Sequence, residues 1–436
     1  MERIAINQLL DWKKRADKKP LIINGARQVG KTWLMKYFGK KYYKNTAYIN
    51  FETNERMKNL FSVDLDVNRL LVNLAVESGQ KIDPTETLMI FDEIQECPKA
   101  LTSLKYFYEN APKYNIIAAG SLLGVALHDG TSFPVGKVEF MDMHPLTFYE
   151  FLDAMGEKGL CDLLKQKDYL HLTVFKDKFI DFLRQYFYVG GMPEVVLKFS
   201  KNNDFALARA TQRQILEAYE RDFSKHIPAS DFSRVKQLWK SIPAQLSKEN
   251  KKFIYKNVKS GAANKTHGLA MEWLVSCGFV HRVARVSKPA LPLKGYETDG
   301  AFKLFLLDVG LLSAMSVLDV RTLLEGEALF KEYKGALTEQ FVCQELKTLD
   351  DVEISYWTNS GATAEVDFLL QLDGKIIPIE VKSTTNLKAK SLKVYQEKFN
   401  PLLSVRSSLA DYKKTDNLHD IPLYALAEIR TFLDDE

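Results

Sequence analysis

Residues 1–150 alternate short apolar runs with amphipathic segments. The apolar runs read PLIING, TAYINF, LMIFDE and NIIAAG, and a helical pattern begins at Thr32. Short buried strands separated by helices are typical of a parallel α/β sheet. We therefore predict an α/β domain with a parallel sheet over residues 1–150.

The pattern becomes helical over residues 151–240, as in FKDKFIDFLRQYFYVGG and ALARATQRQILEAYERDF. Gly190 and Gly191, just before Met192-Pro193, mark a turn between two helices. Residues 241–320 hold short helices followed by strand-like runs with proline and glycine between them. We predict a helical region over 151–240 and a winged-helix-like module over 241–320.

Residues 321–436 begin with a helical pattern and continue with EISYWT, AEVDFLLQL and KIIPIEVKS. Asp373-Gly374 lies between the last two runs and is a strong signal for a two-residue hairpin. A further helix and strand follow. The sequence therefore predicts a second compact α/β unit, so that the fold class of the whole chain is α/β.

Composition agrees with a soluble protein of several domains. The chain has 436 residues, 46% hydrophobic and 27% charged, which is too long for one hydrophobic core and ordinary for a globular protein. The net charge of +4 is weakly basic, so it neither requires nor excludes a nucleic-acid partner.

The four cysteines lie far apart without a C-x-x-C pair, which fits a reducing cytoplasm. The N-terminal segment lacks an apolar signal core, and Asp308 interrupts the most apolar stretch, Phe302–Met315. We expect a cytoplasmic protein without a membrane partner.

One segment satisfies the P-loop pattern G-x-x-x-x-G-K-[ST] at every required position: Gly25, Ala26, Arg27, Gln28, Val29, Gly30, Lys31 and Thr32, followed by Trp33. Its glycines allow backbone N–H groups to surround phosphates, and the following helix adds partial positive charge. Lys31 is expected to reach the β- and γ-phosphates, and the Thr32 hydroxyl to bind Mg²⁺. This predicts an ATP site, whereas a glycine turn before an ordinary helix is the simpler alternative.

Two acids follow the apolar run LMIF about 60 residues after the P-loop. Asp92 can hold Mg²⁺ through water, and Glu93 can polarise the attacking water. Ser121 follows the run Asn115–Gly120 and is expected to sense the γ-phosphate, although a helix N-cap is a compatible role. Asn50 and Glu52 end another strand and could face the same site or the solvent.

The motifs GARQVGKTW, YINFE, IFDEIQ, AAGSLLG, VEFMDMHPLTFYEF and YFYVGGMPEVV together resemble the AAA-type bacterial and archaeal ATPases whose C-terminal half is a domain of unknown function. The resemblance covers nearly the whole chain. In that family the pair before the PLTFYEF-like run usually reads Gly-Arg, but here it is Gly136-Lys137, which leaves the role of that arginine unassigned. If subunits form a homo-oligomer and share the site, Arg184 and Arg221 are candidates for a trans-acting finger, with surface salt bridges as the default.

A second constellation lies near the C-terminus. Asp367 is followed, on the next predicted strand, by Glu380 and Lys382, and this resembles the PD-(D/E)-x-K nuclease core. Strand alternation places Glu380 and Lys382 on one face, where Asp367 can join them. The carboxylates would bind Mg²⁺ and Lys382 would orient water; Glu339, on the preceding helix, is a further candidate ligand. A half-exposed strand has the same appearance, and fold and activity separate readily.

The middle module offers a contact for DNA. Lysines at 248, 251, 252, 256 and 259 precede Asn264-Lys265-Thr266-His267 at a predicted recognition-helix start. A solvated charged face explains the lysines equally well. The chain is thus predicted to be an ATPase that acts on DNA through its C-terminal half. The alternative is a regulatory ATPase switch whose C-terminal half binds a protein or nucleic acid without catalysis.

Overall fold

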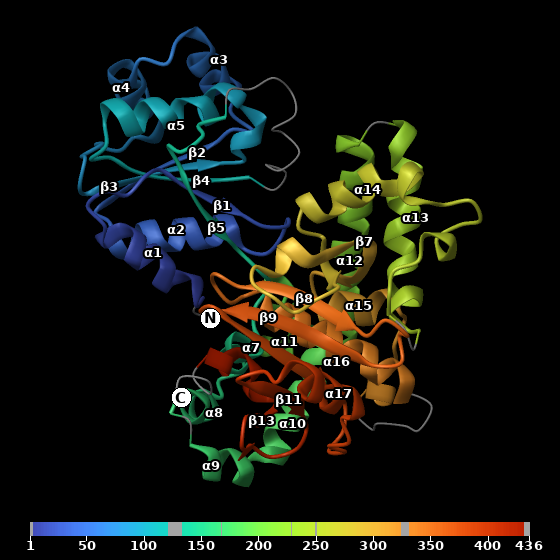
Figure 1. Cartoon of the computed structure of the whole chain (residues 1–436). Coiled ribbons are helices and arrows are strands. Elements are labelled where there is room, and N and C mark those ends of the chain that lie inside the picture. The colour runs from blue at the N-terminus through green and yellow to red at the C-terminus, as the bar shows by residue number, and fades with distance from the viewer. Residues whose placement is uncertain are drawn as a thin grey trace. The chain divides into compact units, whose positions relative to one another are not determined.

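The structure is a computed structural model that describes residues 3–120, 133–166, 168–227, 229–248, 251–323 and 331–430. The chain divides into two compact units (Figure 1). The N-terminal unit comprises residues 2–144 with 276–278, and the C-terminal unit comprises 145–275 with 279–436. Among the described residues no helix is both long and apolar enough to cross a membrane.

The N-terminal unit contains a five-stranded sheet in which every pairing is parallel, in the order β2-β3-β4-β1-β5. Its strands are β1 (Leu21–Asn24), β2 (Asn45–Asn50), β3 (Thr87–Asp92), β4 (Asn115–Ala119) and β5 (Glu139–Asp142). All six residues of β3 are buried, as expected for a strand covered on both faces. The parallel α/β sheet predicted from the apolar runs is confirmed.

Helices cover both faces of this sheet. Figure 1 shows α1 and α2 on one face and α3, α4 and α5 on the other. Their bounds are α1 (Ala5–Lys14), α2 (Lys31–Tyr42), α3 (Glu55–Val63), α4 (Val67–Ser78) and α5 (Pro98–Asn110), with the short 3-10 helix η1 (Ile94–Glu96). On the second face the edges of four phenylalanine rings meet in one core, namely Phe51, Phe61, Phe91 and Phe107.

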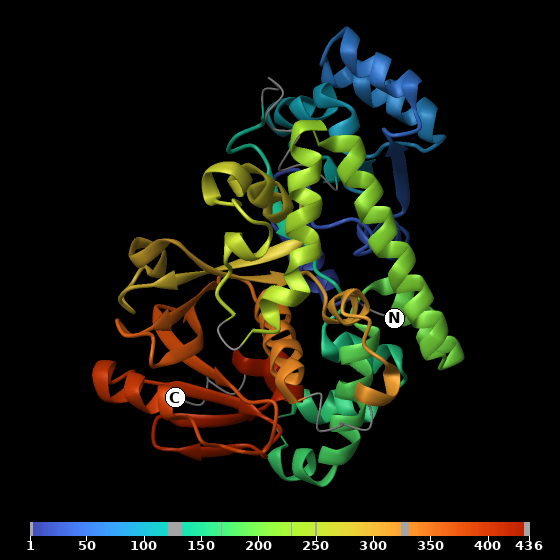
Figure 2. The ribbon, with the colours of Figure 1, turned by 90° about the vertical axis from the view of Figure 1, so that its right-hand side faces the viewer.

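The C-terminal unit begins with helices, as predicted for residues 151–240. They are α7 (Phe148–Ala154), α8 (Lys158–Lys165), α9 (Tyr169–Val174), α10 (Lys176–Val189), α11 (Pro193–Asn202), α12 (Phe205–His226) and α13 (Ala229–Leu246). The long helices α12 and α13 run side by side (Figure 2). Between α10 and α11, Gly190 has φ of +74°, and a Cβ there would lie 2.2 Å from Asp308 Oδ1. The predicted glycine turn is therefore confirmed.

The remaining strands form one mixed sheet in the order β12-β13-β11-β10-β9-β8-β6-β7. They are β6 (Val280–Val286), β7 (Glu297–Leu306), β8 (Glu353–Thr358), β9 (Glu365–Leu372), β10 (Lys375–Val381), β11 (Ser404–Ser408), β12 (Lys413–Thr415) and β13 (Leu418–Pro422). The helices of this part are α14 (Asn264–Ser276), α15 (Val309–Met315), α16 (Lys331–Leu346) and α17 (Lys390–Phe399), with the 3-10 segments η2 (Tyr255–Asn257), η3 (Leu293–Tyr296) and η6 (Leu423–Glu428).

Asp373 and Gly374 connect β9 to β10 with φ of +48° and +74°, so the predicted hairpin is confirmed. Helix α14 is followed by β6 and the antiparallel β7, and β6 also pairs in parallel with β8, so the winged-helix module stays a prediction. One sheet thus crosses the predicted boundary at residue 320. The division into modules at 150, 240 and 320 stays a prediction.

Candidate functional site

The loop between β1 and α2 has the backbone shape of a phosphate cradle. Gly25, Gln28 and Gly30 have φ of +137°, +66° and +97°. A Cβ at Gly25 would lie 2.3 Å from the carbonyl oxygen of Met143, so only glycine fits there. Gly30 is the N-cap of α2 and supplies no side-chain cap, so the first N–H groups of this helix point into the loop without a side-chain acceptor.

Lys31 is the first residue of α2, and it is only 7% exposed. Its ammonium donates to the carbonyl oxygens of Gly25, at 2.7 Å, and Ala26, at 2.8 Å. Burial lowers the pKa of Lys31 to about 8, and Asp92 and Glu93 act in the opposite direction. The Lys31 side chain therefore links the end of the P-loop to its beginning.

Asp92 connects the P-loop to the end of β3. Its Oδ2 accepts a hydrogen bond from the Thr32 hydroxyl at 2.8 Å and another from the Tyr48 hydroxyl at 2.8 Å. Burial, with Asp92 next to it, raises the pKa of Tyr48 to about 12, so the phenol stays protonated as the donor. The structure thus brings together the predicted magnesium residues Thr32 and Asp92, and it adds Tyr48.

Glu93 follows directly and has an unusual backbone. Its φ of +49° places a non-glycine residue in the left-handed region, which costs free energy and is concentrated at functional sites. The Gln95 amide donates to Glu93 Oε2 at 2.6 Å, while Gln95 Oε1 is buried without a hydrogen-bond partner. The carboxylate of Glu93 is therefore held in a defined position beside Asp92.

Arg3 braces the P-loop from outside, a role not predicted from the sequence. It is 6% exposed, and its guanidinium donates to the carbonyl of Val29 at 3.0 Å and to that of His144 at 2.6 Å. No local motif marks Arg3, because its partners are distant in sequence. A buried arginine bonded to the loop fixes the loop backbone.

The other predicted nucleotide residues take several positions. Ala26 and Val29 are buried, whereas Trp33 is 45% exposed and stacks on Tyr37 with ring centroids 4.9 Å apart. Ser121 lies outside the described residues. Of the remaining candidates, Arg27 belongs to the loop, and Asn50 Oδ1 accepts from the backbone of Glu52 at 2.8 Å.

The positively charged candidates for a finger are already paired. Lys137 lies 3.0 Å from Glu109, Arg184 lies 3.1 Å from Asp181, and Arg221 lies 3.8 Å from Glu217. Arg184 and Arg221 each pair with an acid on their own helix. This is the surface salt bridge that was the simpler alternative to a finger.

The loop suits a nucleotide and Mg²⁺. The uncapped start of α2 offers N–H donors for phosphate oxygens, and Lys31 can exchange its two carbonyl acceptors for them. The hydroxyl and carboxylate that meet at 2.8 Å, Thr32 and Asp92, are oxygen ligands of the kind Mg²⁺ prefers.

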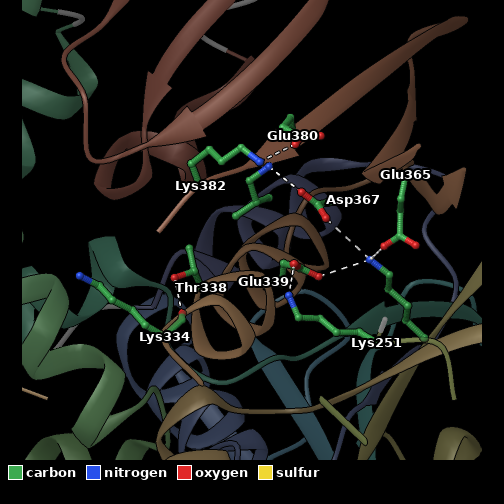
Figure 3. Close-up of polar contacts among 10 residues, drawn as sticks. Lys251, Lys334, Thr338, Glu339, Glu365, Asp367, Glu380 and Lys382 are labelled. Atoms are coloured by element: carbon green, nitrogen blue, oxygen red, sulfur yellow. Dashed lines mark hydrogen bonds and ion pairs between the residues drawn. The ribbon is translucent and has the colours of Figure 1, made fainter. Parts of the chain in front are cut away.

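The C-terminal constellation also comes together (Figure 3). Lys382 Nζ lies 2.6 Å from Glu380 Oε1, and Asp367 Oδ2 accepts from the backbone N–H of Val381 at 2.8 Å. Glu339, on α16, is 6% exposed and faces the same cluster. Glu380 Oε2 is buried without a hydrogen-bond partner.

Two lysines outside the predicted C-terminal constellation hold these carboxylates, and one of them, Lys251, was predicted as a DNA contact. Lys303 on β7 is fully buried, and its Nζ lies 2.6 Å from Glu365, 3.3 Å from Glu339 and 3.8 Å from Asp367. Lys251 also contacts Glu339. One signal could have identified Lys303, because it is a lone charge inside the apolar run AFKLFLL and therefore needs a buried partner.

The lysines set the ionisation of the cluster. Burial alone would raise the pKa of Glu339, but Lys251 and Lys303 hold it at about 2. Burial raises the pKa of Asp367 well above its ordinary value, and Glu339 and Glu380 add to this shift. Burial also raises the pKa of Glu380.

No set of three or more His, Cys, Asp or Glu side chains has metal-binding geometry in the described part of the chain. The Lys303 ammonium lies 3.3 Å from Glu339 and 3.8 Å from Asp367, so it already supplies positive charge to these two carboxylates. The residues therefore fit a lysine-neutralised cluster better than a Mg²⁺ site, and the metal role of Glu339, Asp367 and Glu380 stays a prediction.

The predicted recognition helix begins as expected, since α14 starts at Asn264. Asn264, Lys265 and Thr266 are exposed, but His267 is buried at 6%. Lys256 and Lys259 are exposed just before it. All four cysteines, at 97, 161, 277 and 343, are buried free thiols.

Comparison with protein families places three matches along the chain. Residues 17–152 match an AAA domain, residues 180–322 match a domain of unknown function (DUF8612), and residues 334–426 match another (DUF4143). The chain thus carries a P-loop domain of the AAA type and a C-terminal domain of unknown function, as the resemblance implied. The nuclease resemblance stays a prediction.

Three similar solved structures have low sequence identity to the chain. A Walker-type ATPase of Pyrococcus abyssi is 16% identical with a TM-score of 0.45, and the match covers 72% of this chain and 95% of that one. The ORC1 protein of Aeropyrum pernix in complex with DNA is 11% identical, with a TM-score of 0.28 over 72% of this chain and 91% of that one. Drosophila ORC bound to DNA is 15% identical, with a TM-score of 0.26 over 72% and 94%. No curated protein matches the sequence.

Proposed function

We propose that this chain, an AAA domain followed by a domain of unknown function, binds and hydrolyses ATP with Mg²⁺ at the P-loop. The observation that carries the proposal is the hydrogen bond from Thr32 to Asp92, because it joins the P-loop to the acid that ends β3. Lys31 and the N–H groups at the start of α2 would bind the phosphates, and Thr32 and Asp92 would hold the metal ion, which neutralises charge on the phosphates. Glu93 would accept a proton from the attacking water.

Two substitutions separate binding from hydrolysis. Lys31→Ala should abolish ATP turnover, because the positive charge at the phosphates is lost. Glu93→Gln should keep ATP binding but lose turnover, because binding depends on Lys31, Thr32 and Asp92. Wild-type turnover in Lys31→Ala would refute the P-loop assignment. Equal losses of binding and turnover in Glu93→Gln would make Glu93 a metal ligand.

A second candidate function is DNA binding at the start of α14. It is favoured by the exposed Lys256, Lys259, Asn264 and Lys265, which lie within ten residues of one another along the chain. Each lysine that neutralises a phosphate contributes about one unit to the salt dependence of binding. The double variant Lys256→Gln/Lys265→Gln should bind duplex DNA more weakly and reduce the slope of log K against log salt by about 2. The exposed pair Lys40→Gln/Lys201→Gln is the control, and an equal effect there would reject the α14 surface.

For the C-terminal half we favour binding without cleavage, the alternative to a deoxyribonuclease. The reason is that Lys303 occupies the centre of the carboxylate cluster. Nicking assays with Mg²⁺ across linear and branched DNA should give no cleavage by the wild type. Cleavage that disappears in Asp367→Ala while ATP turnover persists would establish the nuclease instead.

Self-association belongs to the same proposal, because a trans-acting finger requires a neighbouring subunit; the half-buried Arg184 and the exposed Arg221 are its candidates. Light scattering with and without ATP tests it. A particle that stays a monomer under both conditions would exclude a finger in trans.

A further inference from the structure

An exposed aromatic side chain lies at the start of α2, next to the P-loop. Lys31–Leu34 form the first turn of this helix, and of these four residues, all of them described, Trp33 is the exposed one, at 45%. The chain has five tryptophans, and the other four are buried or half-buried. A single exposed apolar ring is ordinary on a protein surface, so the orientation of Trp33 has to carry the argument.

The indole of Trp33 is held in one orientation. It stacks on the ring of Tyr37, one turn further along α2, with 11° between the ring planes. The Lys41 ammonium donates to the Tyr37 hydroxyl at 2.9 Å and lies 5.2 Å from the centroid of that ring. Tyr37 therefore covers the indole face that is directed toward the C-terminal end of α2. The other face is directed toward the P-loop, and within the described ranges no further ring stacks on it.

The phosphate chain determines the side on which a nucleoside would lie. Thr32 directs its hydroxyl to Asp92, where Mg²⁺ and the terminal phosphates would bind. The next residue along a helix is rotated by about 100°, so Trp33 points away from Asp92. The nucleoside is at the opposite end of the phosphate chain from the γ-phosphate. It would therefore leave the loop on the side where Trp33 is exposed.

We propose that Trp33 binds the base of the nucleotide, with the adenine ring stacked on the free face of the indole as a continuation of the stack with Tyr37. Every nucleobase has an aromatic face, so such a contact adds affinity without reading the edge of the base. Trp33 should therefore strengthen the binding of adenine and guanine nucleotides alike. This inference rests on the proposed ATP site and adds the contact that holds the nucleoside.

Calorimetric titration of the full chain with ADP and with inorganic pyrophosphate, both with Mg²⁺, tests the proposal, because only ADP carries a base. Trp33→Leu should weaken ADP binding by roughly five- to a hundredfold and leave pyrophosphate binding unchanged. Trp33→Phe keeps an aromatic face and should restore most of the affinity for ADP. Phe140→Leu is the matched control, since Phe140 on β5 is 53% exposed and stacks on Phe133 with 9° between the ring planes. It should change neither titration.

The outcomes separate this inference from the ATP site itself. If the wild type binds neither ADP nor pyrophosphate, the ATP site is wrong and the base contact is wrong with it. Unchanged ADP binding in Trp33→Leu, or equal losses for ADP and pyrophosphate, would overturn the base contact and leave the P-loop assignment intact.

Tryptophan fluorescence gives a readout that a structural role would not change. Stacking of a base on an indole quenches its emission, so ADP should quench the wild type more than pyrophosphate does, and this difference should disappear in Trp33→Phe. Without nucleotide, Trp33→Leu and Phe140→Leu should melt at similar temperatures. A lower melting temperature of Trp33→Leu together with unchanged ADP binding would make Trp33 a structural residue of α2 and reject the proposal.

Discussion

The guanidinium of Arg3 donates a hydrogen bond to the carbonyl of Val29 inside the P-loop, 26 residues away. Because the same side chain bonds His144, one buried arginine ties the loop to the segment after β5. Arg3→Met should lower the free energy of unfolding by about 2 kcal/mol, a typical value for a lost charged hydrogen bond, and should weaken ATP binding.

Denaturant unfolding and nucleotide titration measure both effects. Arg56→Met is the matched control, since Arg56 is a surface arginine, 81% exposed, that pairs with Glu77. A change of similar size in both variants would show that Arg3 does not brace the loop.

Glu93 provides a test of backbone strain. Its φ of +49° suits glycine, so Glu93→Gly should be more stable than Glu93→Ala by about 1 kcal/mol, although glycine usually destabilises a folded chain. Both variants should lose ATP turnover. Melting curves without nucleotide decide the point, and a less stable Glu93→Gly would mean that the left-handed conformation carries no strain.

Lys303 should be costly to remove. Lys303→Met leaves the buried Glu339 and the half-buried Glu365 and Asp367 with less positive charge, and breaking a buried pair costs about 3–5 kcal/mol. Lys294→Met, on the exposed pair with Glu353, should cost under about 1 kcal/mol. Chemical denaturation of both variants measures the difference, and equal small losses would contradict the network.

Glu345 should make stability depend on pH. Burial raises the pKa of Glu345 to about 8, and the nearby acids Glu150 and Glu428 add to this shift. Its Oε2 is buried without a hydrogen-bond partner. Between its ordinary pKa of 4.5 and about 8, the unfolded chain carries the ionised group while the folded chain keeps it neutral. Unfolding then releases a proton, so this group lowers the free energy of unfolding as pH rises, by up to about 1.4 kcal/mol per pH unit.

Glu345→Gln removes this ionisation but keeps an oxygen for the backbone N–H of Phe148, which Glu345 Oε1 accepts at 3.0 Å. The melting temperature of the variant relative to the wild type should therefore increase from pH 5 to pH 8 and then level off. A constant difference across that range would show that Glu345 is ionised in the folded protein.

Local signals were sufficient for part of the architecture. The P-loop, its preceding strand and the helix that begins at Lys31 follow from glycine and apolar positions within one short segment. The Asp373-Gly374 hairpin is equally local, because the two residues adopt the positive φ that their types favour.

Partners brought together by the fold were not predictable in this way. Tyr48 reaches Asp92 across 44 residues and Lys251 reaches Glu339 across 88, and neither pair has a spacing that a motif could describe. Asp367, Glu380 and Lys382 were predicted from their resemblance to a nuclease core. That pattern carries no information about Lys303, which lies on β7, a different strand of the sheet. The sequence therefore predicted that these carboxylates lie together, but not which lysines neutralise them.

The parallel pairing of β6 with β8, in which Ala284 lies opposite Ser355, has a consequence for protein synthesis. The hairpin of β6 and β7 leaves the ribosome before β8 exists, and at roughly 5–20 residues per second the delay lasts several seconds. During that time the edge of β6 that later pairs with β8 presents unpaired backbone groups, and such an edge can pair with other nascent chains. A fragment that stops near residue 320 would lack β8 and would therefore keep this edge of β6 unpaired.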